Sequence, residues 1–215
     1  MLNFIEKGNK INPQYALIWL HGLGEDGNTA SNDIYKLLDA ELLNKFILIF
    51  PSAKVRSMTF LNGEKHHSWY DKISSEDANQ FDIINSKMYI NNIIQLINIK
   101  YSIEKEKIVL IGFSQGGVIA MSLVISNKDN YACAIGISTF SVLDKIGNCY
   151  RNLTPILLLH GINDDVVSIS RGKKLFTDLI KYGYSVNLIE SNKEHYFDKI
   201  EINIIQNYIK KTLNL

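Results

Sequence analysis

The sequence contains little cysteine, little proline and no strong excess of either charge. Two cysteines in 215 residues, Cys133 and Cys149, are too few for a disulfide framework or a structural zinc site. The net charge is +1 and the basic residues are scattered, so the clustered basic footprint of a nucleic-acid-binding protein is missing. No apolar run is long enough to cross a bilayer, and residues 1–14 lack the regions of a signal peptide. We therefore expect a cytoplasmic protein that does not bind nucleic acid.

Apolar segments with strand and helix patterns alternate along the chain, without an internal repeat or a linker. Continuous apolar runs predict strands at 16–20, 46–50, 108–111, 132–137, 156–159 and 186–189. Helical spacing of apolar residues predicts helices at 34–42, 90–97, 116–125, 175–180 (closed by Gly183) and 200–208. Strands that are apolar throughout are covered on both faces, and strands separated by helices form parallel sheets. The sequence predicts one three-layer α/β domain over residues 1–215.

One long segment, residues 52–77, has no clear period. A loop of that length inside a compact domain usually has a function.

The segment GFSQGG, from Gly112 to Gly117, joins a predicted strand to an apolar helix, with Ser114 at its centre. A strand that turns into a helix within a few residues needs glycines beside the apex, and the apex side chain then projects above the sheet. G-x-S-x-G in this context is the pattern of a nucleophile elbow. A phosphate-binding turn is the alternative, but both G-x-G-x-x-G and the lysine of a Walker A motif are missing. Ser114 is therefore the predicted nucleophile.

A nucleophilic serine needs a histidine to take its proton and a carboxylate to orient that histidine. In α/β-hydrolases the chain order is serine, acid, histidine. After Ser114 come His160, which we expect to be structural because it ends a buried strand, and His195, the predicted base. Asp164 or Asp165 is the predicted acid, and all these loops follow parallel strands whose C-terminal ends share one edge. His66 and His67 precede the serine and would break the order.

An oxyanion needs two backbone N–H donors. One is the residue after the nucleophile, Gln115, and the other normally comes from a loop after an early strand. LIWLHGLGEDG, from Leu17 to Gly27, contains such a loop, because its glycines let the backbone approach a ligand. We expect Leu23 to be the second donor.

These motifs together resemble a known family. HGLGEDG, FPSA at 50–53, SWYD at 68–71, GFSQGG and PILLLHGINDDVV occur in the order and spacing of the carboxylesterase/phospholipase family, which includes acyl-protein thioesterases and lysophospholipases. The resemblance runs from about Tyr15 to the C-terminal helix and implies an α/β-hydrolase fold with the same nucleophile, base and oxyanion donors. It selects Asp164 as the acid. Three residues depart from the family pattern. Asp165 and Ser168 stand where the family often has proline, and Glu194 stands where it often has glycine.

In similar proteins the segment equivalent to 52–77 lies beside the active site and contributes to an acyl pocket. The resemblance therefore makes four apolar residues candidates for such a pocket: Met58, Phe60, Leu61 and Phe140. Ordinary packing beneath a loop is the alternative for each of them. Trp69 and Asp71 are expected to hold the loop in place rather than to touch substrate.

The sequence thus predicts a serine hydrolase that cleaves carboxylic esters or thioesters with an apolar acyl group, without a metal ion or an organic cofactor. A small soluble ester, a lysophospholipid and an S-acylated protein all fit the motif. The alternative from another class is a catalytically silent hydrolase-fold protein that binds a lipid or a protein partner. A peptidase is a third option, but no lid or propeller domain is visible. The oligomeric state is open, with a homodimer among the options.

Overall fold

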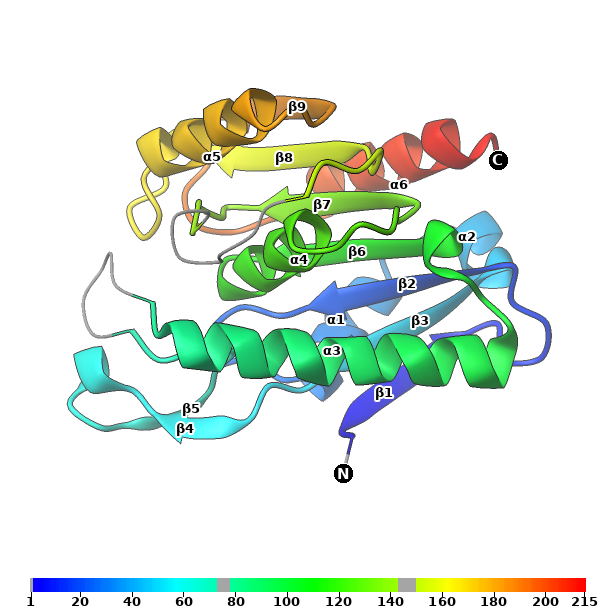
Figure 1. Ribbon diagram of the computed structural model, residues 1–215, viewed down its shortest axis with the longest axis horizontal. Coiled ribbons are helices and arrows are strands. Elements are labelled where there is room, and N and C mark those ends of the chain that lie inside the picture. Colours follow the sequence, from blue (N-terminus) through cyan, green and yellow to red (C-terminus); the bar gives the residue numbers. More distant parts are fainter. Residues whose placement is uncertain (1, 73–77, 143–149) are drawn as a thin grey trace.

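The computed structural model describes residues 2–72, 78–142 and 150–215, so Cys149 lies outside the described residues. A seven-stranded sheet lies between two layers of helices (Figure 1). The strand order is β1-β3-β2-β6-β7-β8-β9, and only the β1–β3 pair is antiparallel. The predicted three-layer α/β fold with a mostly parallel sheet is confirmed.

The sheet strands are β1 Phe4–Gly8, β2 Tyr15–Leu20, β3 Phe46–Pro51, β6 Ile108–Phe113, β7 Cys133–Ile137, β8 Ile156–Gly161 and β9 Val186–Ser191. The α-helices are α1 Gly27–Tyr35, α2 Ala40–Lys45, α3 Gln80–Tyr101, α4 Gln115–Ile125, α5 Ile169–Lys181 and α6 Lys199–Leu213. The remaining elements are two short strands and two 3₁₀ turns: β4 Val55–Ser57, β5 Lys65–His67, η1 Thr59–Leu61 and η2 Lys105–Lys107.

Central strands send alternate side chains into two separate apolar cores. In β2, Ala16, Ile18 and Leu20 face the core that α3, α4 and α5 cover. Leu17 and Trp19 face the opposite core, which α1, α2 and α6 cover. All five are buried, which explains why β2 reads as a continuous apolar run and not as an alternating one.

The structure differs from the predicted elements at three places. β1 was not predicted, because its sequence FIEKG is only half-buried and has no continuous apolar run. The pattern at 34–42 gives two helices, because the Asp39 side chain caps α2 by accepting the Leu42 N–H at 3.0 Å. The aperiodic segment contains an antiparallel hairpin of β4 and β5, connected through η1. Strands of three residues are too short to show a period.

The turn from β6 into α4 holds Ser114 in a strained conformation, with φ 52° and ψ −116°. A non-glycine residue at such a backbone angle costs about 1–3 kcal/mol. The flanking glycines leave room for this turn, because a Cβ on Gly112 would overlap the Gly116 backbone and one on Gly116 would overlap the Leu20 carbonyl. The strand-to-helix turn that the glycine pattern predicts is therefore present.

A buried histidine fixes the end of β2. The Nδ1 of His21 lies 2.6 Å from the Gly22 carbonyl oxygen, and its Nε2 lies 3.0 Å from the Ala53 N–H nitrogen. Nδ1 must donate and Nε2 must accept, so the ring is a neutral imidazole. Burial is the main reason that the pKa of His21 is lowered to about 4, against the opposing effect of the Gly22 hydrogen bond. The loop after β2 is thereby joined to the chain after β3.

This histidine predicts a pH dependence of stability. His21 titrates near 6.5 in the unfolded chain and near 4 in the folded one, so its contribution is present above pH 6.5 and is lost as the pH falls through about 4. In His21→Gln, which keeps an acceptor for the Ala53 N–H, the free energy of unfolding should lose roughly 3 kcal/mol less between neutral pH and pH 4 than in the wild type. Urea unfolding across this range measures the difference. Equal pH slopes for both proteins would contradict the prediction.

Candidate active site

Three side chains from the loops after β6, β8 and β9 meet at the carboxyl edge of the sheet. His195 Nε2 lies 3.1 Å from Ser114 Oγ. His195 Nδ1 lies 2.8 Å from Asp164 Oδ2 and 3.0 Å from Asp164 Oδ1. Because a carboxylate only accepts, Nδ1–H donates to it, and Nε2 is left to accept from the serine hydroxyl. In this geometry an imidazole can take the proton of a serine.

The Asp164 carboxylate is buried and fixed by its own loop. Its Oδ1 accepts the Val166 N–H at 3.0 Å and the Val167 N–H at 2.7 Å. Burial by itself would raise the pKa of the Asp164 carboxyl, but the hydrogen bonds from Val167 and His195 outweigh burial and hold this pKa below its usual range. The carboxylate therefore stays ionised beside His195. The three residues that depart from the family pattern, in contrast, are exposed: Asp165, Ser168 and Glu194.

Asp164 and His195 sit on two loops that are hydrogen-bonded to each other. The Asn163 N–H donates to the Lys193 carbonyl at 3.0 Å, and the Ile162 N–H donates to the Ser191 carbonyl at 2.8 Å. The loops after β8 and β9 are thus held together directly beside the carboxylate–imidazole pair.

The His195 ring packs against an aromatic side chain from β6, the strand that precedes Ser114. The centroids of the Phe113 and His195 rings are 4.9 Å apart, and Phe197 packs against Phe113 at 5.1 Å. This packing restricts the imidazole to the plane in which it reaches Ser114. Phe113 could not be singled out from the sequence, because it reads as one more apolar residue of the strand before Ser114.

The expected oxyanion donors are the backbone N–H groups of Leu23 and Gln115, and neither has an acceptor within the described part of the chain. The neighbours of Leu23 are both occupied. The Gly22 N–H donates to Glu25 Oε2 at 3.1 Å, and the Gly24 N–H donates to the His67 carbonyl at 3.0 Å. Among Gly22, Leu23 and Gly24, only the Leu23 N–H has no acceptor within the described residues.

The sequence analysis did not single out Glu25. Its carboxylate shapes the turn by accepting the Gly22 N–H, and burial is the main cause of the raised pKa of this carboxyl.

The other histidines have structural contacts. His160 is buried and its Nε2–H donates to the Val167 carbonyl at 2.7 Å, as expected for a structural residue. His66 and His67 belong to β5, where His67 Nδ1 lies 2.7 Å from the Ala53 carbonyl oxygen.

The four candidates for an acyl pocket lie on two segments. Met58 is fully buried, whereas Phe60 and Leu61 belong to η1, and 40% of Phe60 is exposed. Phe140 follows β7 and is buried, and the Arg171 guanidinium carbon lies 3.7 Å from the centroid of its ring. The hairpin lies on the side of the molecule toward which the parallel strands point (Figure 1). A role of these residues in acyl binding remains a prediction.

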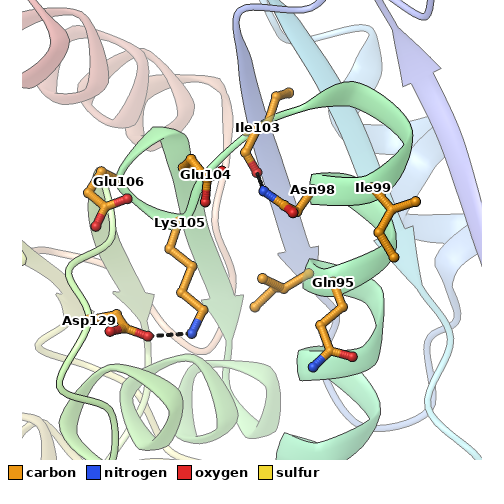
Figure 2. A pocket seen from close by; sticks show the side chains of 9 residues that line it. Gln95, Asn98, Ile99, Ile103, Glu104, Lys105, Glu106 and Asp129 are labelled. Carbon is orange, nitrogen blue, oxygen red and sulfur yellow. Dashed lines mark hydrogen bonds and ion pairs between the residues drawn. The ribbon is translucent and has the colours of Figure 1, made fainter.

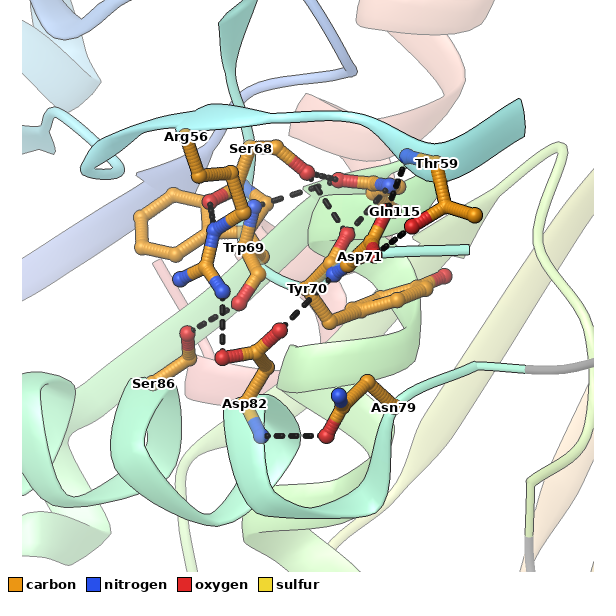
Figure 3. Close-up of polar contacts among 10 residues, drawn as sticks. All are labelled: Arg56, Thr59, Ser68, Trp69, Tyr70, Asp71, Asn79, Asp82, Ser86 and Gln115. Carbon is orange, nitrogen blue, oxygen red and sulfur yellow. Dashed lines mark hydrogen bonds and ion pairs between the residues drawn. The ribbon is translucent and has the colours of Figure 1, made fainter. Parts of the chain in front are cut away.

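The SWYD segment holds the hairpin, as expected for Trp69 and Asp71. The Trp69 indole N–H donates to the His21 carbonyl at 2.8 Å. The Asp71 carboxylate accepts the Thr59 N–H at 2.8 Å and the Thr59 hydroxyl at 2.5 Å (Figure 3).

A groove between α3 and η2, shown in Figure 2, lies near the start of β6, whereas Ser114 follows its end. It is bridged by the ion pair of Lys105 and Asp129, 2.5 Å apart, and by a hydrogen bond from the Asn98 amide to the Ile103 carbonyl. Because η2 precedes β6 whereas Ser114 follows it, the groove lies at the opposite edge of the sheet and is not part of the candidate site.

Among the described residues, no helix is long and apolar enough to span a membrane, and no cluster of three or more acidic, His or Cys side chains could hold a metal ion.

Solved structures share the fold. Arabidopsis thaliana SOBER1 matches with a TM-score of 0.83 at 23% identity, covering 93% of this chain and 99% of that one. The Bacillus cereus carboxylesterase matches with a TM-score of 0.80 at 17% identity, covering 99% of this chain and 95% of that one. At these identities the likeness shows the fold alone.

Sequence comparison shows the family. Lysophospholipase-like protein 1 of Mus musculus is 29% identical over 205 residues, covering 90% of this chain and 85% of the relative. Acyl-protein thioesterase 1 homolog 2 of Dictyostelium discoideum is 26% identical over 221 residues, covering 99% of each. Residues 3–213 match the phospholipase/carboxylesterase family as a whole. Because this match spans nearly the entire chain, the protein belongs to the phospholipase/carboxylesterase family of α/β-hydrolases.

Proposed function

We propose that the protein is a serine hydrolase that cleaves carboxylic esters or thioesters with an apolar acyl group through an acyl-enzyme. Ser114 is the nucleophile, His195 the base, Asp164 the acid, and Leu23 and Gln115 donate their N–H groups to the oxyanion. The observation that carries this proposal is the continuous chain of hydrogen bonds from Ser114 Oγ through the imidazole to the Asp164 carboxylate.

In the first step, His195 Nε2 takes the hydroxyl proton while Ser114 Oγ attacks the acyl carbonyl carbon. The π electrons of the carbonyl move to its oxygen, which binds the Leu23 and Gln115 N–H groups. One such donor contributes about 3 kcal/mol to the transition state. The bond to the alcohol or thiol then breaks, and this leaving group takes the proton from His195 Nε2.

In the second step, water replaces the leaving group. His195 Nε2 takes a proton from the water as its oxygen attacks the acyl carbon. The bond to Ser114 Oγ breaks, the serine recovers its proton from His195, and the free acid leaves. Both steps require Asp164 to hold the same imidazole tautomer, which its buried position and backbone hydrogen bonds support.

The substrate class follows from the relatives and from the apolar candidates near the site. The matched relatives carry the names lysophospholipase-like protein and acyl-protein thioesterase. We therefore include lysophospholipids and S-acylated proteins, together with small esters, among the proposed substrates.

Removing the nucleophile tests the proposal directly. Ser114→Ala should lower the rate of p-nitrophenyl ester hydrolysis by more than about 10⁴-fold, because nothing else in the site can form the acyl-enzyme. A fluorophosphonate probe should label the wild type but not the variant, and circular dichroism should show the same fold for both. Absence of labelling in the folded wild type would instead support a catalytically silent protein that binds a lipid or a partner.

The two adjacent aspartates provide a matched pair. Asp164→Asn should lower kcat about 10⁴-fold, because an amide favours the wrong imidazole tautomer. Asp165→Asn should leave kcat nearly unchanged, since its exposed side chain is not bonded to His195. Steady-state kinetics on one ester compares them, and equal losses would refute the assignment of Asp164 as the acid.

The apolar acyl pocket predicts a dependence on chain length. From acetyl to palmitoyl, as oxygen esters and as thioesters, kcat/KM should first rise with each added methylene, because burying one contributes about 0.8 kcal/mol. Phe60→Ser should flatten this rise. Phe81→Ser, at an exposed position on α3, is the matched control and should leave it intact. A profile that is flat in the wild type would argue against an apolar pocket.

A further inference from the structure

The Gln115 side chain has a buried position that its role as an oxyanion donor does not explain. Gln115 begins α4 directly after Ser114, and its backbone N–H is the group that the proposed mechanism uses. Its side chain lies against the SWYD segment, as Figure 3 shows. Only 3% of the residue is exposed, so its amide must find partners within the protein.

All partners of this amide belong to the segment Ser68–Tyr70. Gln115 Oε1 accepts the Trp69 N–H at 3.1 Å and lies 2.9 Å from the Ser68 hydroxyl. Gln115 Nε2 donates to the Tyr70 carbonyl at 3.1 Å. The amide thus bonds one backbone N–H and one backbone carbonyl of this segment, together with the Ser68 side chain, and it connects the helix that carries one oxyanion donor to residues 68–70.

The same segment is bonded to the turn that carries the other donor. The Trp69 indole N–H donates to the His21 carbonyl at 2.8 Å, two residues before Leu23. The His67 carbonyl accepts the Gly24 N–H at 3.0 Å, one residue after Leu23. Residues 67–70 therefore touch the backbone on both sides of Leu23, and through Gln115 they also touch the start of α4.

We propose that the Gln115 side chain is a positioning residue that sets the separation of the two oxyanion donors, Leu23 N–H and Gln115 N–H, by fixing both to residues 67–70. A donor misplaced by a fraction of an ångström no longer reaches the oxyanion well, although it still permits ground-state binding. Removing the amide should therefore lower kcat and leave KM largely unchanged. This inference rests on the proposed function and adds a role for a side chain of the same site.

The test variant is Gln115→Met, which keeps the backbone N–H and the approximate volume but removes all hydrogen bonds of the amide. For a p-nitrophenyl ester we expect kcat to fall about 10- to 100-fold, which is no more than the fall in kcat that follows the loss of one oxyanion donor. Fluorophosphonate titration counts the active molecules, so that a smaller folded fraction does not lower the apparent kcat.

A second readout separates positioning from a merely structural role. A trifluoromethyl ketone forms a tetrahedral oxyanion on the serine, so its Ki should rise by the same factor by which kcat falls. Thr59→Val is the matched control. It removes the hydrogen bond from the Thr59 hydroxyl in the hairpin to the Asp71 carboxylate, which does not connect the two donors, and it should change neither kcat nor Ki.

The outcomes are distinct. If Gln115→Met retains the kcat and Ki of the wild type, the inference is overturned while the proposed function stands. If the wild type hydrolyses no ester and takes no probe, the proposed function fails, and the inference fails with it. Should Gln115→Met not fold, Ser68→Ala removes one of the same contacts, and a parallel change of kcat and Ki would support the inference. An unchanged kcat and Ki in Ser68→Ala would overturn it.

Discussion

At the turn from β6 to α4 the backbone of Gly116 packs directly against the backbone at the end of β2, and the positions of the site residues depend on this contact. The turn that gives Ser114 a positive φ has room because Gly112 and Gly116 have no side chain, and Gly116 lies directly against the carbonyls that end β2. The residues that follow these carbonyls form the turn that carries Leu23. One steric contact therefore brings the serine, the start of α4 and the second donor turn into a fixed arrangement.

The hairpin beside the site shows how a weak element can be kept in place. Two strands of three residues are only marginally stable in water. Polar contacts with α3 compensate, as Figure 3 shows: Arg56 forms an ion pair with Asp82, the Asp82 carboxylate accepts the Asp71 N–H at 3.0 Å, and Ser86 donates to the Trp69 carbonyl. The segment is thus positioned by α3 and the central layers rather than by its own pairing.

The sequence allowed the fold to be predicted, together with the convergence of Ser114, His195 and one of two adjacent aspartates, because continuous apolar strands imply a parallel sheet and loops after such strands share one edge. The choice of Asp164 over Asp165 came from the family resemblance. It did not reveal β1, which is half polar, or the hairpin, whose strands are too short for a period. Phe113 and the Gln115 amide were missed for another reason. Their roles depend on contacts with residues distant along the chain, and no local pattern records such contacts.

The bonding between the loops after β8 and β9 makes Asp164 and His195 one rigid body. Ser114 belongs to a different body, and β7 separates the two in the sheet. A change in the twist of β7 would therefore alter the proton-transfer distance while the imidazole kept its orientation toward the carboxylate. Packing changes in either core that shift β7 can thus change the distance from Ser114 to His195, in addition to changes transmitted by the direct packing of Phe113 on the His195 ring.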